Sequence, residues 1–103
     1  MRNRLRLPPR ELAEFAERQR VLTKRLAEKI PSLSKEEREL GEKLLDFFKK
    51  LARAPHRNRL EVISWRRRLD FFAEIWRSCP AVRKEILTAS DLLRRLIRQT
   101  SNS

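Results

Sequence analysis

The chain has 103 residues, of which 40% are apolar, and its 26 Lys and Arg against 14 Asp and Glu give a formal net charge of +12. This length predicts a single domain, 1–103, whose core needs neither disulfides nor metal ions. Tyr is absent and Gly occurs once, which disfavours strands and hairpins. One Cys, one His and no glycine-rich loop provide no metal cluster and no catalytic constellation, so we expect neither an enzyme nor a cofactor.

The N-terminal segment 1–9 is basic and has no apolar run of the kind that signal peptides contain, so we expect it to form a basic arm. No segment is apolar for long enough to span a membrane. A lone Cys cannot form an internal disulfide. The sequence therefore predicts a cytoplasmic protein without membrane attachment.

The first predicted helix covers about 10–30 and ends at Pro31. Its apolar stripe contains Leu12, Phe15, Ala16, Leu22, Leu26 and Ile30. Gln19 and Thr23 fall in the middle of this stripe. Buried polar residues at such positions either find partners or determine register and oligomeric state.

The second predicted helix begins at a capping box, Ser34-Lys35-Glu36-Glu37, and ends before Pro55. Asn58 is the expected N-cap of the third helix. The apolar stripes are Leu40, Leu44, Phe47, Phe48 and Leu51 on the second helix, and Val62, Trp65, Leu69, Phe72, Ala73 and Trp76 on the third. Leu60, Phe71 and Ile75 form a second apolar face of the third helix, which predicts contact with two neighbours or with another subunit.

The fourth predicted helix covers about 80–99, with Pro80 in its first turn and a frayed tail at 100–103. Its apolar stripe contains Val82, Ile86, Ala89, Leu93, Leu96 and Ile97. Short connections place successive helices antiparallel. The sequence thus predicts an all-α fold, an antiparallel up-down-up-down four-helix bundle, and the second apolar face of the third helix predicts a homo-oligomer.

Other reactive side chains have simple structural interpretations. His56 lies in a predicted connection, where we expect it to be solvated. Cys79 precedes Pro80 and is interpreted as a small residue at a helix boundary. Trp65 and Trp76 share one apolar stripe, which favours a role in the core over base stacking, because stacking rings must be exposed.

Arg is the main basic residue, and its planar fork matches phosphate oxygens. The fourth predicted helix carries Arg and Lys opposite its apolar stripe, diluted by Asp91 alone. A second cluster runs from Arg53 to Arg68, although Arg66 with Asp70, and Glu74 with Arg77, can neutralise each other. The candidate phosphate contacts are Arg57, Arg59, Arg67, Arg68, Arg83, Lys84, Arg94, Arg95 and Arg98.

No helix-turn-helix, zinc-finger, RNA-recognition or KH signature accompanies these cations, so the sequence predicts RNA or DNA binding with weak sequence selectivity and strong salt dependence. Two alternatives stay open. A GC-rich genome also raises Arg content. A protein-interaction adaptor or inhibitor, such as a phage- or plasmid-encoded regulator, would use the same charge to bind an acidic protein.

Three segments carry a family resemblance: Ile30-Pro31 ahead of 37–44, the run 65–77, and the last-helix segment 91–97. Over about residues 12–98, the order of these features resembles the four-helix-bundle family of the accessory variability determinant (Avd) of diversity-generating retroelements and the proteins encoded in 23S rRNA intervening sequences. The chain lacks the glycine- and tryptophan-bearing C-terminus usual in that family, and its loops are short for it. The resemblance implies a basic, ring-like homo-oligomer, typically a pentamer, that contacts a reverse transcriptase and binds RNA and DNA during cDNA synthesis, without catalytic residues.

Overall fold

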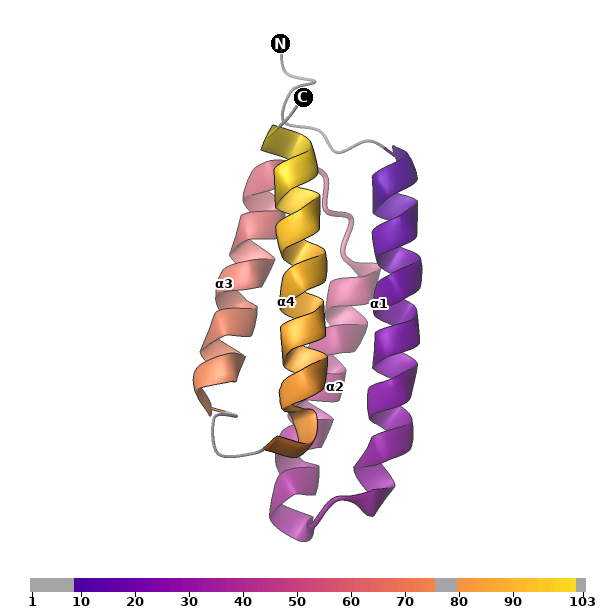
Figure 1. The fold of residues 1–103 in the computed structure, drawn as a ribbon, viewed down its shortest axis with the longest axis vertical. Coiled ribbons are helices and arrows are strands. Elements are labelled where there is room, and N and C mark those ends of the chain that lie inside the picture. Colours follow the sequence, from indigo (N-terminus) through magenta and orange to yellow (C-terminus); the bar gives the residue numbers. More distant parts are fainter. Residues whose placement is uncertain (1–8, 76–79, 102–103) are drawn as a thin grey trace.

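The structure, a computed structural model, describes residues 9–75 and 80–101. They form four α-helices, with a 3₁₀ turn, η2, at Ile30–Ser32. The helices are α1 (Pro9–Lys29), α2 (Lys35–Arg53), α3 (Arg59–Ile75) and α4 (Pro80–Ser101). Successive helices alternate in direction (Figure 1). The predicted all-α, antiparallel four-helix bundle is confirmed, and the described residues contain no strand.

Close helix packing joins α1 to both α2 and α4, and α3 to α4. Large aromatic side chains bridge the remaining side, between α2 and α3. The ring of Phe47 on α2 lies 5.4 Å from that of Trp65 and 4.7 Å from that of Phe72, both on α3. The four helices therefore enclose one core, and half-buried Trp65 packs against it, in agreement with the role in the core that the sequence favoured.

The core is built mainly from the apolar stripes that the sequence predicted, and Leu33 from the turn after α1 adds to them. Its buried side chains are Phe15, Leu22, Leu26, Ile30, Leu33, Leu44, Phe47, Phe48, Leu51, Val62, Leu69, Val82, Ile86, Ala89, Leu93 and Leu96. Burying one such side chain stabilises the fold by about 1.5–3 kcal/mol. Ala73 is an exception: it is exposed, one turn beyond Leu69, the last buried side chain of α3 in the described residues. Trp76 and Cys79 lie outside the described residues.

Side chains cap the starts of α2 and α3 as predicted. Ser34 Oγ accepts from the Glu37 amide at 3.3 Å, and the Glu37 carboxylate accepts from the Ser34 amide at 3.2 Å. Asn58 Oδ1 accepts from the Glu61 amide at 3.1 Å. The Glu61 carboxylate reaches one residue further back than in a regular capping box and accepts from the Arg57 amide at 2.6 Å.

The predicted end of the first helix is correct within one residue, whereas the predicted end of the fourth helix needs correction. Pro31 lies within η2, so the chain continues past α1 in a tighter turn, closed by the bond from the Leu33 amide to the Ile30 carbonyl. α4 extends through Ser101, two residues beyond the predicted end. Thr100 and Ser101 are therefore helical rather than part of a frayed tail. Residues 1–8 of the predicted basic arm and 102–103 lie outside the described part of the chain.

His56 is buried, which contradicts the expectation of a solvated loop histidine. Its backbone φ of 46° is left-handed and turns the ring back under the C-terminus of α2, where Nε2 lies 2.9 Å from the Leu51 carbonyl oxygen. Because that oxygen can only accept, Nε2 donates and satisfies one of the free carbonyls at the helix end. The ring also contacts Phe15 and Trp65 edge-on. Burial lowers the pKa of His56, and the bond to Leu51 opposes this in part.

Candidate nucleic-acid interface

The basic residues of α4 lie on the face opposite the core. Helical periodicity places Val82, Ile86 and Leu93 inward, so the intervening positions point to solvent. The exposed cations are Arg83, Lys84, Arg94, Arg95 and Arg98. None of them forms an ion pair with a carboxylate of the described residues. These charges are available to an external anion.

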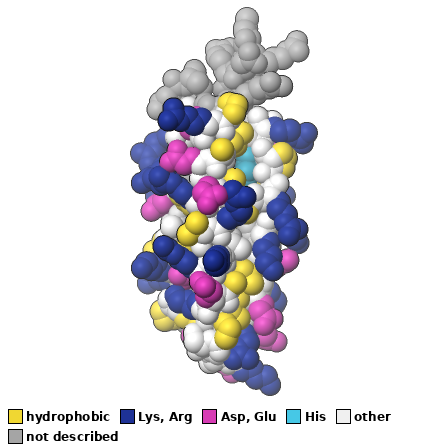
Figure 2. Space-filling view, turned by 90° about the vertical axis from the view of Figure 1, so that its right-hand side faces the viewer, with side chains coloured by type: hydrophobic (Ala, Val, Ile, Leu, Met, Phe, Trp, Pro, Cys, Tyr) yellow, Lys and Arg dark blue, Asp and Glu magenta, His cyan; other side chains and the backbone are white. Residues whose placement is uncertain are grey.

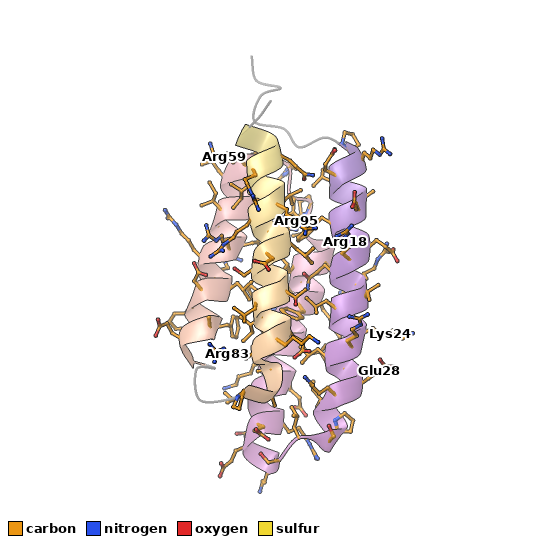
Figure 3. The ribbon with its side chains drawn as sticks, viewed as in Figure 1. Arg18, Lys24, Glu28, Arg59, Arg83 and Arg95 are labelled. Carbon is orange, nitrogen blue, oxygen red and sulfur yellow. The ribbon has the colours of Figure 1, made fainter. Side chains whose placement is uncertain are left out.

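The α4 cations do not form one continuous row. Leu87, which is 55% exposed, and Asp91 separate the pair at the start of the helix from the three Arg residues near its end. Arg95 lies on the flank that faces α1, whereas Arg83 lies at the opposite end of α4, beside the end of α3 (Figure 3). Arg95 lines a small α1–α4 pocket together with Arg18, so its charge is directed away from the outer face.

The predicted contacts on α3 and its preceding loop divide into three groups. Arg59 and Arg67 are exposed and make no ion pair within the described chain. The Arg68 guanidinium lies 4.8 Å from the ring of Trp65, and this contact places it on the flank that faces α2. The Arg57 side chain pairs with Glu61 at 3.2 Å, so its charge is largely compensated.

Hydrogen bonds and nearby charge lower the pKa of Glu61. The amide of Arg57 contributes most, and the Arg57 side chain adds to it. Glu61 therefore stays ionised under ordinary conditions and keeps Arg57 in place. Arg57 is accordingly a weaker candidate for a phosphate contact than the sequence indicated.

The expected ion pair between Arg66 and Asp70 is absent, because no contact between these two described residues falls within 4.0 Å. Arg66 is half-buried, and its Nε is buried without a hydrogen-bond partner in the described part of the protein. Arg77, the expected partner of Glu74, lies outside the described residues. We define the α3–α4 basic surface as the exposed, unpaired cations of the two helices: Arg59, Arg67, Arg83, Lys84, Arg94 and Arg98.

A further basic surface was not predicted from the sequence. α1 and α2 enclose a groove of about 450 Å³. The groove is lined by Arg20, Lys24, Lys49 and Arg53, with Thr23, Ala27, Leu45 and Ala52 between them. The sequence feature that could have indicated this surface is the i,i+4 spacing of the cations on each helix. Sequence proximity grouped Arg53 with the α3 cluster, whereas the structure places it in this α1–α2 groove.

Figure 2 views the molecule from the side where α1 lies in Figure 1, and basic side chains alternate there with apolar and acidic ones. The face is therefore charged but not uniformly positive. Arg20 pairs with Glu17 at 2.6 Å, whereas Lys24, Lys49 and Arg53 have no ion-pair partner among the described residues.

Apolar side chains interrupt the outer surface of α3. Leu60 is 69% exposed and Phe71 is 68% exposed, on the second apolar face that the sequence predicted. The four-helix core leaves these two side chains uncovered. The Ile75 side chain, expected on the same face, is outside the described part.

Comparisons of the chain with protein-family models, curated proteins and solved structures found no match. No group of three or more metal-ligating side chains occurs among the described residues. None of the helices that the structure describes is both long and apolar enough to cross a membrane.

Proposed function

We propose that the protein is a basic, homo-oligomeric nucleic-acid-binding accessory that contacts the phosphates of RNA or DNA. The observation that carries the proposal is the α3–α4 basic surface, where exposed cations have no carboxylate partner in the described part of the chain. Arg predominates on it, and a guanidinium presents paired N–H donors to phosphate oxygens. Binding releases condensed counterions from the nucleic acid, which supplies most of the affinity.

This mode of binding reads charge rather than sequence. In this mode, cations on the outside of packed helices contact the phosphate backbone. No separate helix or strand enters a groove of the nucleic acid to read its bases. We therefore expect similar affinities for unrelated sequences of equal length. About six phosphate contacts would reduce affinity about a thousandfold between about 50 and 200 mM salt.

The more specific part of the proposal is that the protein assists a reverse transcriptase in diversity-generating retroelement cDNA synthesis and assembles as a pentamer. Its support is the family resemblance of the sequence. The exposed Leu60 and Phe71 would supply apolar surface for subunit or enzyme contact. Size-exclusion chromatography with light scattering tests the pentamer, and copurification with a coexpressed reverse transcriptase of such a retroelement tests the partnership. A monomer, or an enzyme that does not copurify, contradicts the corresponding part.

A second candidate function is an adaptor that binds an acidic protein. The observation that favours it is the same pair of exposed apolar side chains, because Arg67 lies between Leu60 and Phe71 on the outer side of α3. An apolar patch with a central Arg is typical of protein interfaces. Pull-down with and without nuclease separates the functions, since an adaptor retains its partner after nucleic acid is digested.

The main proposal is tested by fluorescence anisotropy with labelled mixed-sequence RNA and DNA over a salt series. The α3–α4 variant combines Arg83→Gln, Arg94→Gln and Arg98→Gln. A control variant of equal net charge combines Arg25→Gln, Lys35→Gln and Lys43→Gln, at exposed cations that also have no ion-pair partner among the described residues. We expect steep salt dependence for the wild-type protein and a clearly larger loss of affinity in the α3–α4 variant. Absence of binding, or a flat response to salt, overturns the proposal.

A further inference from the structure

The α1–α2 groove combines two rows of cations with a nearly apolar floor. Arg20 and Lys24 lie one turn apart on α1, and Lys49 and Arg53 lie one turn apart on α2. The two helices are antiparallel neighbours, so one row lies on each side of the groove. Lys24 projects from the outer side of α1 (Figure 3).

The lining of the groove is unbalanced in charge. No acidic side chain is among its lining residues, and the described part of the chain offers Lys24, Lys49 and Arg53 no ion-pair partner. Arg20 alone is paired, through Glu17 on the outside. Like charges one helical turn apart destabilise a helix. An anion that lies between the rows would relieve this repulsion.

The apolar floor of the groove limits the kinds of anion that suit it. Ala27, Leu45 and Ala52 are small or apolar, and they suit the faces of sugars and bases better than a fully hydrated ion. No aromatic ring lines the groove, so stacking would not select particular bases. The groove has a volume of about 450 Å³, which has room for the sugar and phosphate of a single strand but not for a whole duplex, which is much wider.

We propose that the α1–α2 groove binds the sugar–phosphate backbone of a single-stranded nucleic acid, with Lys24, Lys49 and Arg53 contacting its phosphates. This inference rests on the proposed nucleic-acid-binding function and adds a strand-selective site to it. The α3–α4 basic surface lies on the outside of its two helices, where a duplex can lie against it. In this proposal the bundle has two phosphate-binding surfaces, on different pairs of helices.

The test uses the full chain and labelled strands of about 16 nucleotides, single-stranded or paired. The groove variant combines Lys24→Gln, Lys49→Gln and Arg53→Gln. The α3–α4 variant and the control variant defined above also lose three positive charges each, so the three proteins have the same net charge and differ in where the charges are removed. Gln has nearly the helix propensity of Lys and Arg, and circular dichroism verifies that each variant is folded.

We expect the groove variant to bind the single strand about tenfold more weakly and to change duplex affinity less than about twofold. The slope of log K against log salt for the single strand should decrease by about 2, because three contacts contribute about 0.7 each. The inference is overturned if the groove variant matches the control, or if it weakens strand and duplex equally.

Two more outcomes separate the sources of failure. If the wild-type protein binds neither strand nor duplex, the proposed function itself is wrong. If the wild-type protein binds and only the groove variant is without effect, the inference alone is wrong. Inorganic tripolyphosphate serves as competitor: displacement of the strand at equal phosphate concentration would show that free phosphate occupies the groove, and would also overturn the assignment to a strand.

Discussion

The ammonium of Lys29 at the end of α1 lies 3.1 Å from Oε1 and 3.3 Å from Oε2 of Glu85 on α4. The same nitrogen donates to the Ala81 carbonyl at 2.7 Å. Among ion pairs of the described residues, this is the one that joins two helices. Glu85 is buried on the core side of α4 and has its charge compensated by Lys29.

Replacing Lys29 by Met should destabilise the bundle by about 1–3 kcal/mol, because a buried carboxylate would lose its partner. The loss stays below that for a fully buried pair, since the Lys29 side chain is 37% exposed and solvent screens the interaction. Urea denaturation measures the free energy of unfolding. In the double variant Lys29→Met and Glu85→Met, most of the stability should return; additive losses would contradict the coupling.

His56 predicts a pH dependence of stability. Its pKa is lowered in the folded protein relative to its ordinary value of 6.5, so the unfolded chain binds the proton more readily. The free energy of unfolding is therefore constant well above pH 6.5 and decreases as the pH falls through that value toward the lower folded pKa. Thermal unfolding from about pH 7.5 to 5.5 measures this decrease.

The control for His56 is His56→Asn, because Asn tolerates the left-handed backbone at this position. His56 is the one His of the chain, so the variant should show a much flatter profile over the same pH range. Glu61, whose pKa is lowered, contributes stability that is lost only at more acidic pH. If the stability of the His56→Asn variant decreased equally as the pH falls, a group other than His56 would be responsible for the titration.

Gly41 allows α2 to lie close to the turn after α1. A Cβ at this position would lie 3.1 Å from Leu33 Cδ1 and 3.3 Å from Ile30 Cγ1. Gly41→Val should destabilise the protein by about 1–3 kcal/mol through overpacking. Glu39→Val at an exposed position of α2 is the control for the lower helix propensity of Val. This control should lose less than about 1 kcal/mol of stability. Equal losses in chemical denaturation would show that the close contact is unimportant.

The side-chain amide of Gln19 is fully buried, and neither Nε2 nor Oε1 has a hydrogen-bond partner in the described part of the chain. Thr23 bonds to the backbone oxygen of Gln19 instead. Gln19→Met keeps the volume and removes two unpaired polar atoms, so we expect stabilisation by about 1 kcal/mol. Exposed Gln99→Met is the control. A less stable Gln19 variant would contradict this expectation and would show that the amide stabilises the bundle.

Local features of this bundle could be predicted because they depend on residues three or four positions apart. Helical periodicity specified the core face of each helix, and Ser34 and Asn58 marked two helix starts correctly. The exposure of the α4 cations followed from the same periodicity. The nucleic-acid function itself stays a proposal.

Features that join distant segments required the tertiary structure. The Lys29–Glu85 pair spans 56 positions, and the α1–α2 groove exists only where two helices pack side by side. His56 is buried because a left-handed turn brings it against Phe15 from another helix. The sequence by itself determined which face of each helix is apolar, since that depends on local geometry. Which charges meet across helices depends on helix order and spacing, and only packing of the whole chain decides these.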